Sequence, residues 1–452
     1  YDVPLLDLGK IANYEPSSAA VLLGGYALIF ALYFVGHRAV CHLTRRETRD
    51  ARRALAFIIA SALLFALILL SVYPIGANDI YDYIFRARLW GYYDFNPLTV
   101  TPLQVNDDRW FPFVVWIWFP SPYGPLWTYL SVALYRLAGD VLLTNLVLFK
   151  LLPALSIVAC AFILYDMLKA RGDGRAVAGV LLFTWNPLLL FESVVNGHND
   201  IVMVMFVLVA LWLYRRRRFT TALVCCVLAA CVKAAAAVAL PLMFVAVLRQ
   251  ISPPLPKQFY HFGRGGRGVR SVLACLAVVV ALYAPLWRGA ETLAGLGALD
   301  NRFTSSLAAI VKLSLEAIIG REPAEAWTRS AFGVLFVLLY GYRVWQVRSD
   351  ADGLQEDMFT VFALLLIVGT LWFEPWYVVW VIALAPLVKP PLQRMTMLWS
   401  ASALCTYLIF DFAWYWWPDF FNTANVLVLN VTVVALWLGP LLVRPARLLI
   451  TD

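Results

Sequence analysis

Charged residues are scarce in this sequence of 452 residues. Asp, Glu, Lys and Arg make up 14% of it, whereas about a quarter of the residues in a typical soluble domain are charged. Hydrophobic residues make up 62%, and burying so many of them would need a core far larger than a globular domain builds. The shortage of charge therefore excludes an ordinary soluble protein.

A disulfide framework and the common catalytic motifs are missing. Of the seven cysteines, six lie inside apolar blocks, where a thiol behaves as a small hydrophobic side chain. The sequence contains no P-loop, no GxSxG turn and no HExxH pair. These absences argue against a P-loop nucleotide hydrolase, an α/β-hydrolase and a zinc enzyme of the HExxH type.

The sequence does contain apolar blocks of roughly 15 to 25 residues, about the length that a helix needs to cross a ~30 Å hydrocarbon layer. Such blocks must be helices, because lipid cannot satisfy backbone polar groups. The predicted spans are 18–36, 54–73, 141–167, 175–193, 200–214, 219–232, 235–248, 270–287, 329–347, 357–373, 376–389, 394–411 and 423–442. The sequence thus predicts an all-α polytopic membrane protein with a single transmembrane domain over residues 1–452.

The number of spans depends on one pair of short blocks. Residues 219–232 and 235–248 meet near Lys233, and they form either two half-length helices or one kinked span. We therefore expect about 12 or 13 transmembrane helices.

The basic residues predict how the spans are oriented. With the N-terminus outside, 24 of the 36 Lys and Arg residues fall on the cytoplasmic side, as the positive-inside rule requires. The same arrangement places the C-terminus in the cytoplasm. Because these residues are divided among short loops, the net charge of +8 does not indicate nucleic-acid binding.

Two long segments then face the non-cytoplasmic side. Residues 74–140 form the first outer loop, which is rich in aromatic residues and proline. Within it, residues 123–139 are hydrophobic enough to span, but a span there would invert the distribution of basic residues in every later loop. We interpret them as a juxtamembrane helix at the interface. Residues 288–328 form the second outer loop, with a predicted amphipathic helix.

The start of the first outer loop carries the strongest candidates for chemistry. Asp79, Asp82 and Arg86 are spaced so that they share one face of a helix. Polar residues at a helix exit are often only solvated caps, but these are embedded among Ile, Tyr and Phe residues. A partly buried carboxylate is costly unless it is paired or used.

Two further clusters lie at predicted turns or inside spans. The NGHND turn, 196–200, follows Glu192 by one helical turn and would be polar without any function. His198 beside Asp200 could nevertheless bind a phosphate or orient a second carboxylate. Lys233 lies in an apolar run, where a lysine is by default functional or paired.

Lys150 also lies in an apolar run, but its side chain can extend to the interface. The segment Glu374-Pro375-Trp376-Tyr377 places an acid and two aromatic residues at an outer helix start. Aromatic residues are common at that depth, so this signal is weaker.

Five sequence motifs follow one another along the chain in a characteristic order and spacing. They are NDIYDYIFRARLWGYYDFNPL (78–98), SPYGPLWTYLSVALYRLAG (121–139), NPLLLFESVVNGHNDIVMV (186–204), VKAAAAVALPL (232–242) and EPWYVVWVIALAPL (374–387). Together they resemble the GT-C glycosyltransferases, membrane enzymes that take sugar from a polyprenyl-phosphate carrier on the outer leaflet. Within that superfamily the sequence is most similar to the bacterial polyprenyl-phosphomannose-dependent α-mannosyltransferases.

The resemblance implies roles for particular residues. The family's catalytic base falls on Asp79; the related pattern often has one residue between two acids, where this chain has two, so Asp82 stays open as the alternative. The residues expected to stabilise the leaving phosphate are Lys233, His198, Arg86 and Arg302. The residues expected to bind substrate are Asn199, Asp200, Glu374, Trp376 and Tyr377. No cofactor is expected because the leaving group is a monophosphate, although a divalent metal stays open.

The resemblance also implies a reaction and a location. A carboxylate would deprotonate the acceptor hydroxyl in an inverting transfer, at the outer face of a bacterial cytoplasmic membrane. The donor would be a polyprenyl-phosphate-linked sugar, with mannose expected and glucose, arabinose and aminoarabinose as alternatives. The acceptor would be an envelope glycan or glycolipid. The alternative function is a transporter or flippase of a lipid-linked substrate, although the sequence shows no inverted repeats.

Overall fold

The protein is a bundle of helices in the computed structural model, which describes residues 8–43, 48–251, 265–298, 302–417, 419 and 426–442. Within these ranges the only β-structure is two isolated bridges. The predicted all-α class is therefore confirmed. The C-terminal residues that we expect in the cytoplasm lie outside the described ranges.

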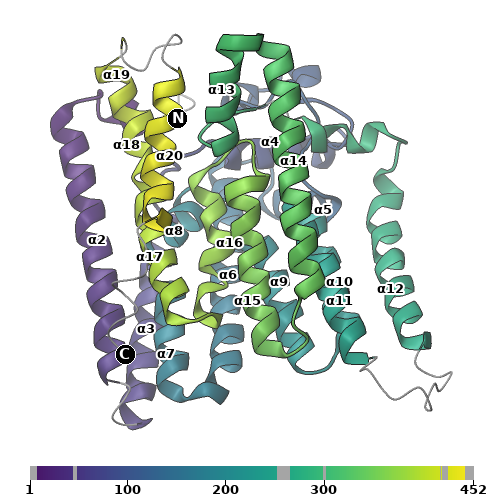
Figure 1. Ribbon diagram of the computed structural model, residues 1–452. Coiled ribbons are helices and arrows are strands. Elements are labelled where there is room, and N and C mark those ends of the chain that lie inside the picture. Colours follow the sequence, from purple (N-terminus) through teal and green to yellow (C-terminus); the bar gives the residue numbers. More distant parts are fainter. Residues whose placement is uncertain are drawn as a thin grey trace.

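Long apolar helices run side by side through the bundle (Figure 1). They include α2 (Pro16–Leu43), α3 (Thr48–Leu70) and α6 (Leu142–Leu168). Large apolar side chains on their outer faces are exposed: Val21 is 76% exposed and Leu67 is 67% exposed. Contiguous exposure of this kind is unfavourable in water and is the ordinary state of a lipid-facing helix.

The remaining helices are mostly shorter. Their bounds are α1 (Leu8–Ile11), α7 (Asp173–Thr184), α8 (Pro187–Leu190), α9 (Asp200–Arg215), α10 (Phe219–Val232), α11 (Ala239–Ile251), α12 (Gly265–Tyr283), α14 (Arg321–Gln346), α15 (Ala351–Leu364), α16 (Val379–Ile382), α17 (Pro390–Leu404), α18 (Thr406–Leu408), α19 (Trp414–Trp416) and α20 (Val426–Leu442). The predicted span 376–389 is not one straight helix, because α16 lies between two 3₁₀ turns, Pro375–Val378 and Ala385–Leu387.

Several of these helices have the length and composition of membrane spans. Five helices in the described part of the chain are long and apolar enough to cross a membrane. A sixth results if α7 and the segment Pro187–Val195, bent by 50° against it, form one span. Other predicted spans are shorter, such as α10 with 14 residues and α11 with 13. The structure supports a polytopic membrane protein, and the total of about 13 spans stays a prediction.

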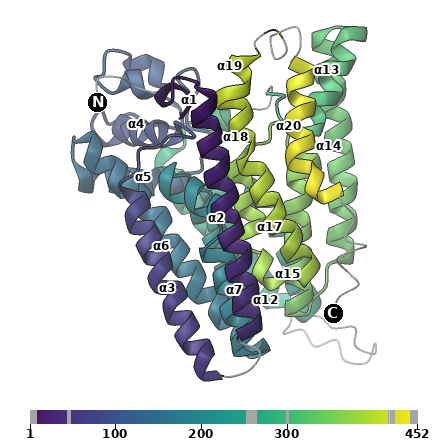
Figure 2. The same cartoon turned by 90° about the vertical axis from the view of Figure 1, so that its left-hand side faces the viewer.

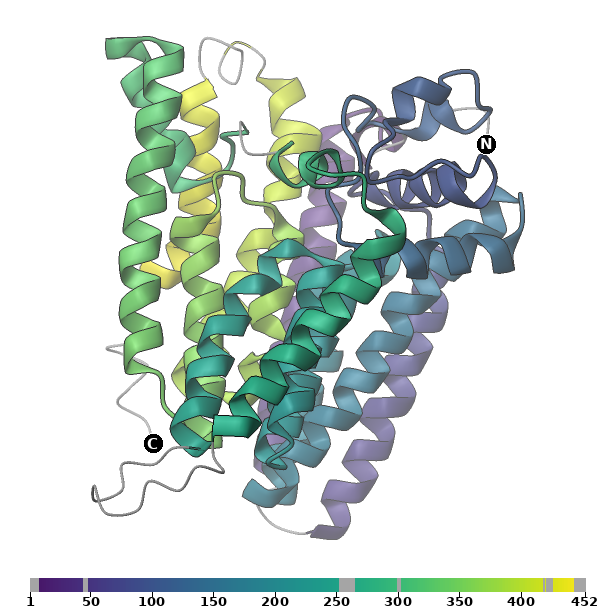
Figure 3. The same ribbon diagram turned by 90° about the vertical axis from the view of Figure 1, so that its right-hand side faces the viewer.

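The first predicted outer loop folds into two helices that lie across one end of the bundle. Figures 2 and 3 show α4 (Asp79–Gly91) and α5 (Pro125–Ala138) running across the direction of α3 and α6. The predicted amphipathic helix corresponds to α13 (Leu307–Ile319), at the same end (Figure 1). Its N-cap Ser306 accepts a hydrogen bond from the backbone N–H of Ala309 at 3.0 Å.

A close backbone contact attaches α5 to the end of α10. The N–H of Gly124 donates to the carbonyl of Val232 at 3.2 Å. A Cβ atom at Gly124 would lie 2.1 Å from the carbonyl oxygen of Cys231, so only glycine allows this approach. Lys233 follows in an extended conformation, and a 3₁₀ turn, Ala234–Val238, leads into α11. Of the two arrangements that the sequence left open, the structure therefore has two short helices.

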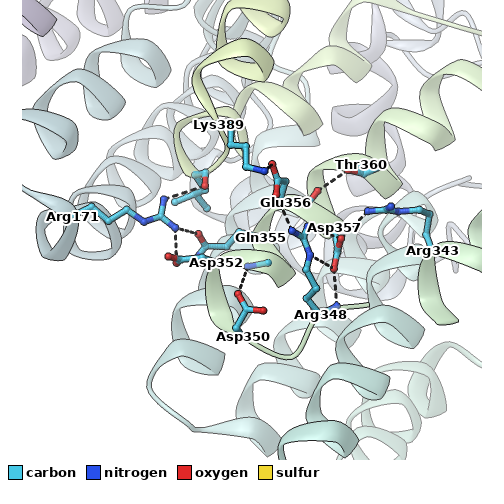
Figure 4. Close-up of polar contacts among 12 residues, drawn as sticks. Arg171, Arg343, Arg348, Asp350, Asp352, Gln355, Glu356, Asp357, Thr360 and Lys389 are labelled. Atoms are coloured by element: carbon cyan, nitrogen blue, oxygen red, sulfur yellow. Dashed lines mark hydrogen bonds and ion pairs between the residues drawn. The ribbon is translucent and has the colours of Figure 1, made fainter. Parts of the chain in front are cut away.

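Ion pairs fasten the opposite end of the bundle (Figure 4). The carboxylate of Asp357 in α15 accepts from Arg343 of α14 at 2.7 Å and from Arg348 at 2.8 Å. Arg171, which follows α6, pairs with Asp352 at 2.5 Å. These contacts join the loop after α6 and the loop between α14 and α15 into one network.

Lys150 of α6 completes the end of a neighbouring helix. It is buried, and its Nζ donates to the carbonyl oxygens of Leu69, Leu70 and Val72 at 3.1, 3.1 and 2.5 Å. Carbonyls at a helix C-terminus have no partner within their own helix. Lys150 supplies that partner to α3 and points into the protein instead of extending to the interface.

Candidate active site

The NGHND turn connects a π-helical turn to α9. The π-helical turn, Phe191–Val195, holds Glu192 fully buried inside the bundle. Gly197 has φ of +74°, and a Cβ atom there would lie 2.6 Å from the side chain of Ile80 in α4. Only glycine tolerates both the left-handed backbone and this contact. The turn therefore packs directly against the first residues of α4.

Asp79 begins α4, and each of its carboxylate oxygens faces a side chain from another segment. The indole Nε1 of Trp116 donates to Oδ1 at 3.1 Å, while Nδ1 of His198 lies 3.7 Å from Oδ2. The Asp79 side chain remains 14% exposed. It is thus a partly exposed carboxylate at the edge of a buried polar cluster.

Asp82 is engaged differently, although it lies on the same helix. It is buried, and Nε of Arg86 donates to its Oδ2 at 2.7 Å. The other guanidinium nitrogens of Arg86 donate to the carbonyls of Phe119 and Trp116 at 3.0 and 2.9 Å. All three guanidinium nitrogens of Arg86 therefore donate, one to Asp82 and two to backbone carbonyls of the segment that carries Trp116.

His198 lies between two carboxyl groups. Its Nε2 is 3.4 Å from Oε2 of Glu192, on the side of the ring away from Asp79. The ring is stacked on Trp376, with centroids 4.2 Å apart and an interplanar angle of 18°. Glu192 also accepts hydrogen bonds from Asn196 at 2.8 Å and from the hydroxyl of Tyr407 at 3.0 Å.

Lys233 and Asp200 form a second charged pair in the site. The Nζ of Lys233 lies 2.8 and 2.9 Å from the two carboxylate oxygens of Asp200. Trp380 donates to the same carboxylate at 2.5 Å. The ammonium group lies 4.9 Å from the ring centroid of Tyr377, within the range of a cation–π interaction.

Arg302 lies at the exposed edge of the site. Thr304 exchanges backbone hydrogen bonds with the segment after α15, which brings Arg302 beside Trp372. Its guanidinium carbon lies 4.3 Å from the ring centroid of Trp116 and 5.3 Å from that of Trp372. Glu374 is close enough to raise the pKa of Arg302, although burial has the larger effect and lowers it.

The crowding of carboxyl groups affects the acidity of Asp79. Burial, assisted by the nearby carboxylates of Asp82 and Asp200, raises the pKa of Asp79 to about 6. The hydrogen bond from Trp116 acts in the opposite direction and is outweighed. Asp79 is therefore mostly ionised at neutral pH and close enough to its pKa to accept a proton.

Two neighbouring groups are shifted towards their uncharged forms. Burial and the charge of Asp79 raise the pKa of Glu374 well above its ordinary value. Burial and the charge of Lys233 hold the pKa of His198 well below its ordinary value, so its imidazole is neutral at pH 7. The site thus avoids some of the cost of several buried charges of one sign.

The structure brings together most of the residues singled out from the sequence. Asp79 lies beside His198, feels the charges of Asp200 and Lys233, and shares Trp116 with Arg302, so these residues form one cluster. Asp82 and Arg86 form their own buried pair. Glu374, Trp376 and Tyr377 line the same cluster. Asn199 is fully buried, and neither polar atom of its amide has a partner among the described residues.

Sequence reasoning missed several contributors to the site. Trp116 lies in an aromatic stretch in which no spacing distinguishes it from its neighbours. Trp380 and Tyr407 belong to apolar blocks that read as membrane helices. Glu192 could be recognised only as an acid inside a predicted span, where a carboxyl group costs free energy unless it has a partner or a function. Among the described residues, no group of three or more His, Cys, Asp or Glu side chains is placed to hold a metal ion.

Apolar helices that carry a partly exposed carboxylate and two cations at one end are features of a membrane glycosyltransferase, and similarity to known proteins confirms this class of enzyme. The chain belongs to the alpha-(1->6)-mannopyranosyltransferase family, whose N-terminal domain matches residues 4–249, more than half of the chain. The family resemblance inferred from the sequence is therefore confirmed.

Three relatives are similar over different lengths. The chain is 22% identical over 411 residues to alpha-(1->6)-mannopyranosyltransferase A of Corynebacterium glutamicum. The aligned region covers 85% of this chain and 82% of that protein. It is 24% identical over 201 residues to alpha-(1->6)-mannopyranosyltransferase B of the same organism, which covers 44% and 33%. It is 23% identical over 285 residues to alpha-(1->6)-mannopyranosyltransferase A of Mycobacterium tuberculosis, which covers 62% and 51%.

Proposed function

We propose that the chain transfers mannose from a polyprenyl-phosphate carrier to a hydroxyl group of an envelope glycan or glycolipid, with inversion at the anomeric carbon. Family membership supports the sugar and the transfer. The observation that carries the mechanism is the placement of Asp79, a partly exposed carboxylate in one cluster with Lys233 and Arg302. Such a cluster supplies both a base for the acceptor and cations for the leaving group.

We propose that the site faces outwards from a bacterial cytoplasmic membrane. The cluster lies at the end of the bundle that carries α4, α5 and α13 (Figures 1 and 2). The loop residues Arg171 and Arg348 lie at the other end. The positive-inside rule assigns that other end to the cytoplasm, so the active site faces outwards.

In the proposed reaction the acceptor hydroxyl gives its proton to Asp79. The acceptor oxygen forms a bond to the anomeric carbon from the face opposite the phosphate, and the bond from that carbon to the phosphate oxygen breaks. The electron pair leaves with the lipid phosphate, which gains a negative charge. The single displacement inverts the configuration of the sugar.

Asp79 suits the role of base better than Asp82. A base must reach the proton that it removes, and Asp79 is 14% exposed at the edge of the cluster, while the side chain of Asp82 is 2% exposed and lies against Arg86. Burial raises the pKa of Asp82, and the ion pair with Arg86 opposes that effect without outweighing it. Access to the acceptor proton, and not acidity, therefore separates the two acids.

The leaving phosphate is placed beside Arg302, with Lys233 behind it. Arg302 is the exposed cation of the cluster, and its contacts among the described residues are the faces of Trp116 and Trp372. Lys233 and Trp380 both donate to Asp200, so Asp200 does not fully neutralise the ammonium group of Lys233, which can still attract the phosphate. Arg86 is engaged by Asp82 and two carbonyls, and His198 lies between carboxyl groups, so we assign neither to the phosphate.

The remaining polar and aromatic groups suit the sugars. Glu374 can donate to and accept from hydroxyl groups. The amide of Asn199 is fully buried and has no partner among the described residues, so it can donate to or accept from the groups that line the site. Tyr377 and Trp376 offer apolar faces to a sugar ring, while Asp200 positions Lys233. We propose these five as substrate-binding or positioning residues.

Transfer assays on two matched variants test this proposal. We expect Asp79→Asn to lower the transfer of mannose from polyprenyl-phosphomannose about 10²- to 10⁴-fold, the range of a lost general base. Asp82→Asn changes the neighbouring acid on the same helix and should reduce transfer less. Unimpaired transfer by Asp79→Asn would exclude it as the base. A wild-type protein that transfers no sugar from any polyprenyl-phosphate donor would exclude the function.

A further inference from the structure

Asp79 is one end of a line of three acid–base groups that leads into the bundle. His198 has one ring nitrogen 3.7 Å from Asp79 and the other 3.4 Å from Glu192. Exposure falls along this line, from 14% for the side chain of Asp79 to 1% for His198 and 0% for Glu192. The exposed base is thus connected through an imidazole to a carboxyl group that no solvent reaches.

The imidazole at the centre has unused hydrogen-bonding capacity. Neither ring nitrogen of His198 has a hydrogen-bond partner among the described residues, although the side chain is buried. A buried polar group without a partner is costly. Its ring is held in place by stacking on Trp376 and by the backbone bond from its own N–H to the carbonyl of Glu192 at 3.0 Å. Catalytic hydrogen bonds are often long before substrate binds and shorten in the complex.

We propose that His198 and Glu192 are positioning residues for the base, in a chain in which His198 donates from Nδ1 to Asp79 and accepts at Nε2 from Glu192. This inference rests on the proposed function of Asp79. A neutral imidazole has one donor and one acceptor nitrogen, so it joins two carboxyl groups only if one of them carries a proton. With Asp79 ionised, that proton is on Glu192.

The consequence for the reaction is a fixed orientation of the base. Trp116 holds one oxygen of Asp79 and His198 holds the other, so the carboxylate cannot rotate away from the acceptor. Its charge is spread over two donors until it takes the acceptor proton. The proton then leaves from Asp79, the exposed member of the chain, to water.

The neighbours of Glu192 determine what a glutamine there would do. The amide of Asn196 is fixed, since its oxygen accepts from the N–H of Gly76 at 3.0 Å while its nitrogen donates to Oε2 of Glu192. In Glu192→Gln the side-chain oxygen must therefore stay beside Asn196. That oxygen faces Nε2 of His198 and forces the imidazole proton from Nδ1 to Nε2.

The same reasoning applies to the other end of the chain. In Asp79→Asn the amide oxygen stays with the donor Trp116, and the amide nitrogen faces Nδ1 of His198. This variant also moves the imidazole proton to Nε2. Lys233 is the other charged group that faces His198, and neither variant changes it.

Nitrogen NMR on protein labelled at histidine tests the chain directly, since the sequence has only four histidines. His198→Gln assigns the resonances. We expect wild-type His198 to carry its proton on Nδ1, and Glu192→Gln and Asp79→Asn each to move it to Nε2. The same proton position in all three proteins would overturn the proposal, and either variant suffices if the other does not fold.

Kinetics provide the second measurement. We expect Glu192→Gln to lower kcat on the order of 10-fold or more with little change in KM, because the base is still present but misoriented. Ser193→Ala, at the adjacent buried residue whose hydroxyl has no partner in the described structure, is the matched control and should keep the wild-type kcat. Equal kcat values for the two variants would overturn the role of Glu192. If the wild type transfers no sugar, the proposed function fails while the NMR measurement still decides whether the chain exists.

Discussion

At the scale of single residues, the environment of Asp79 gives the proposed reaction a pH dependence. The reaction requires ionised Asp79, whose pKa is raised to about 6 chiefly by burial. We expect kcat/KM to rise with pH up to about 6 and to fall about tenfold per pH unit below it. A rate profile in detergent or nanodiscs from pH 4.5 to pH 8 measures this. A rate that stays level down to pH 5 would contradict the assignment of Asp79 as base.

The same residue makes the site costly for stability. Because the folded state holds the Asp79 proton up to about pH 6 and the unfolded chain releases it near pH 4, stability falls as pH rises through this window. Asp79→Asn removes this loss and should gain up to about 3 kcal/mol at pH 7, at roughly 1.4 kcal/mol per pKa unit. Apparent melting temperatures measure it. At pH 4 the variant and the wild type should melt alike, and a gain of the same size at both pH values would contradict this origin.

The site residues that could be predicted from the sequence are those whose burial would cost free energy if they had neither a partner nor a function. Asp79, His198 and Lys233 stood out because a titratable group in an apolar surrounding needs a partner or a use. The sequence could not reveal which partner each one has. Lys150 and Lys233 look alike in sequence, but one caps α3 and the other pairs with Asp200. Trp116 gave no signal, because aromatic residues are common at a membrane interface.

At the scale of elements, the contact between α5 and the end of α10 keeps the first loop on the site. In Gly124→Ala the new Cβ atom would lie 2.1 Å from the carbonyl oxygen of Cys231, so the two backbones must separate. We expect a loss of about 1–3 kcal/mol, as for other overpacked sites, together with a lower kcat. Gly25→Ala in α2, where nothing lies within 4 Å, is the control and should not destabilise. Equal melting temperatures for the two variants would contradict the role of this contact.

The elements themselves were predicted to different degrees. Long apolar blocks became α2, α3 and α6 with few changes, because length and hydrophobicity suffice to identify such helices. The block 376–389 became a short helix between 3₁₀ turns, since Pro375 just before it and Pro386 within it interrupt the backbone hydrogen-bond pattern. π-helical turns such as Phe191–Val195 have no sequence pattern, yet one of them carries Glu192.

At the scale of the whole molecule, the proposed active site lies at one end of the bundle, and a network of ion pairs joins segments at the other (Figure 4). Asp357→Asn weakens two arginine contacts there, and we expect a loss of about 2 kcal/mol with an unchanged kcat. Asp350→Asn is the control, because asparagine caps a helix as well as aspartate does, and it should change stability by less than about 0.5 kcal/mol. A large fall in kcat for Asp357→Asn would show that the two ends are coupled.

The proposed reaction is a single displacement, which requires the base and the leaving phosphate to lie on opposite sides of the sugar. The anomeric configuration of the product tests this claim most directly. Wild-type protein is incubated with polyprenyl-phosphomannose labelled at the anomeric carbon and with a mannan acceptor, and the product is examined by carbon NMR. We expect a configuration opposite to that of the sugar on the carrier. A product of retained configuration, or no transfer at all, would contradict it.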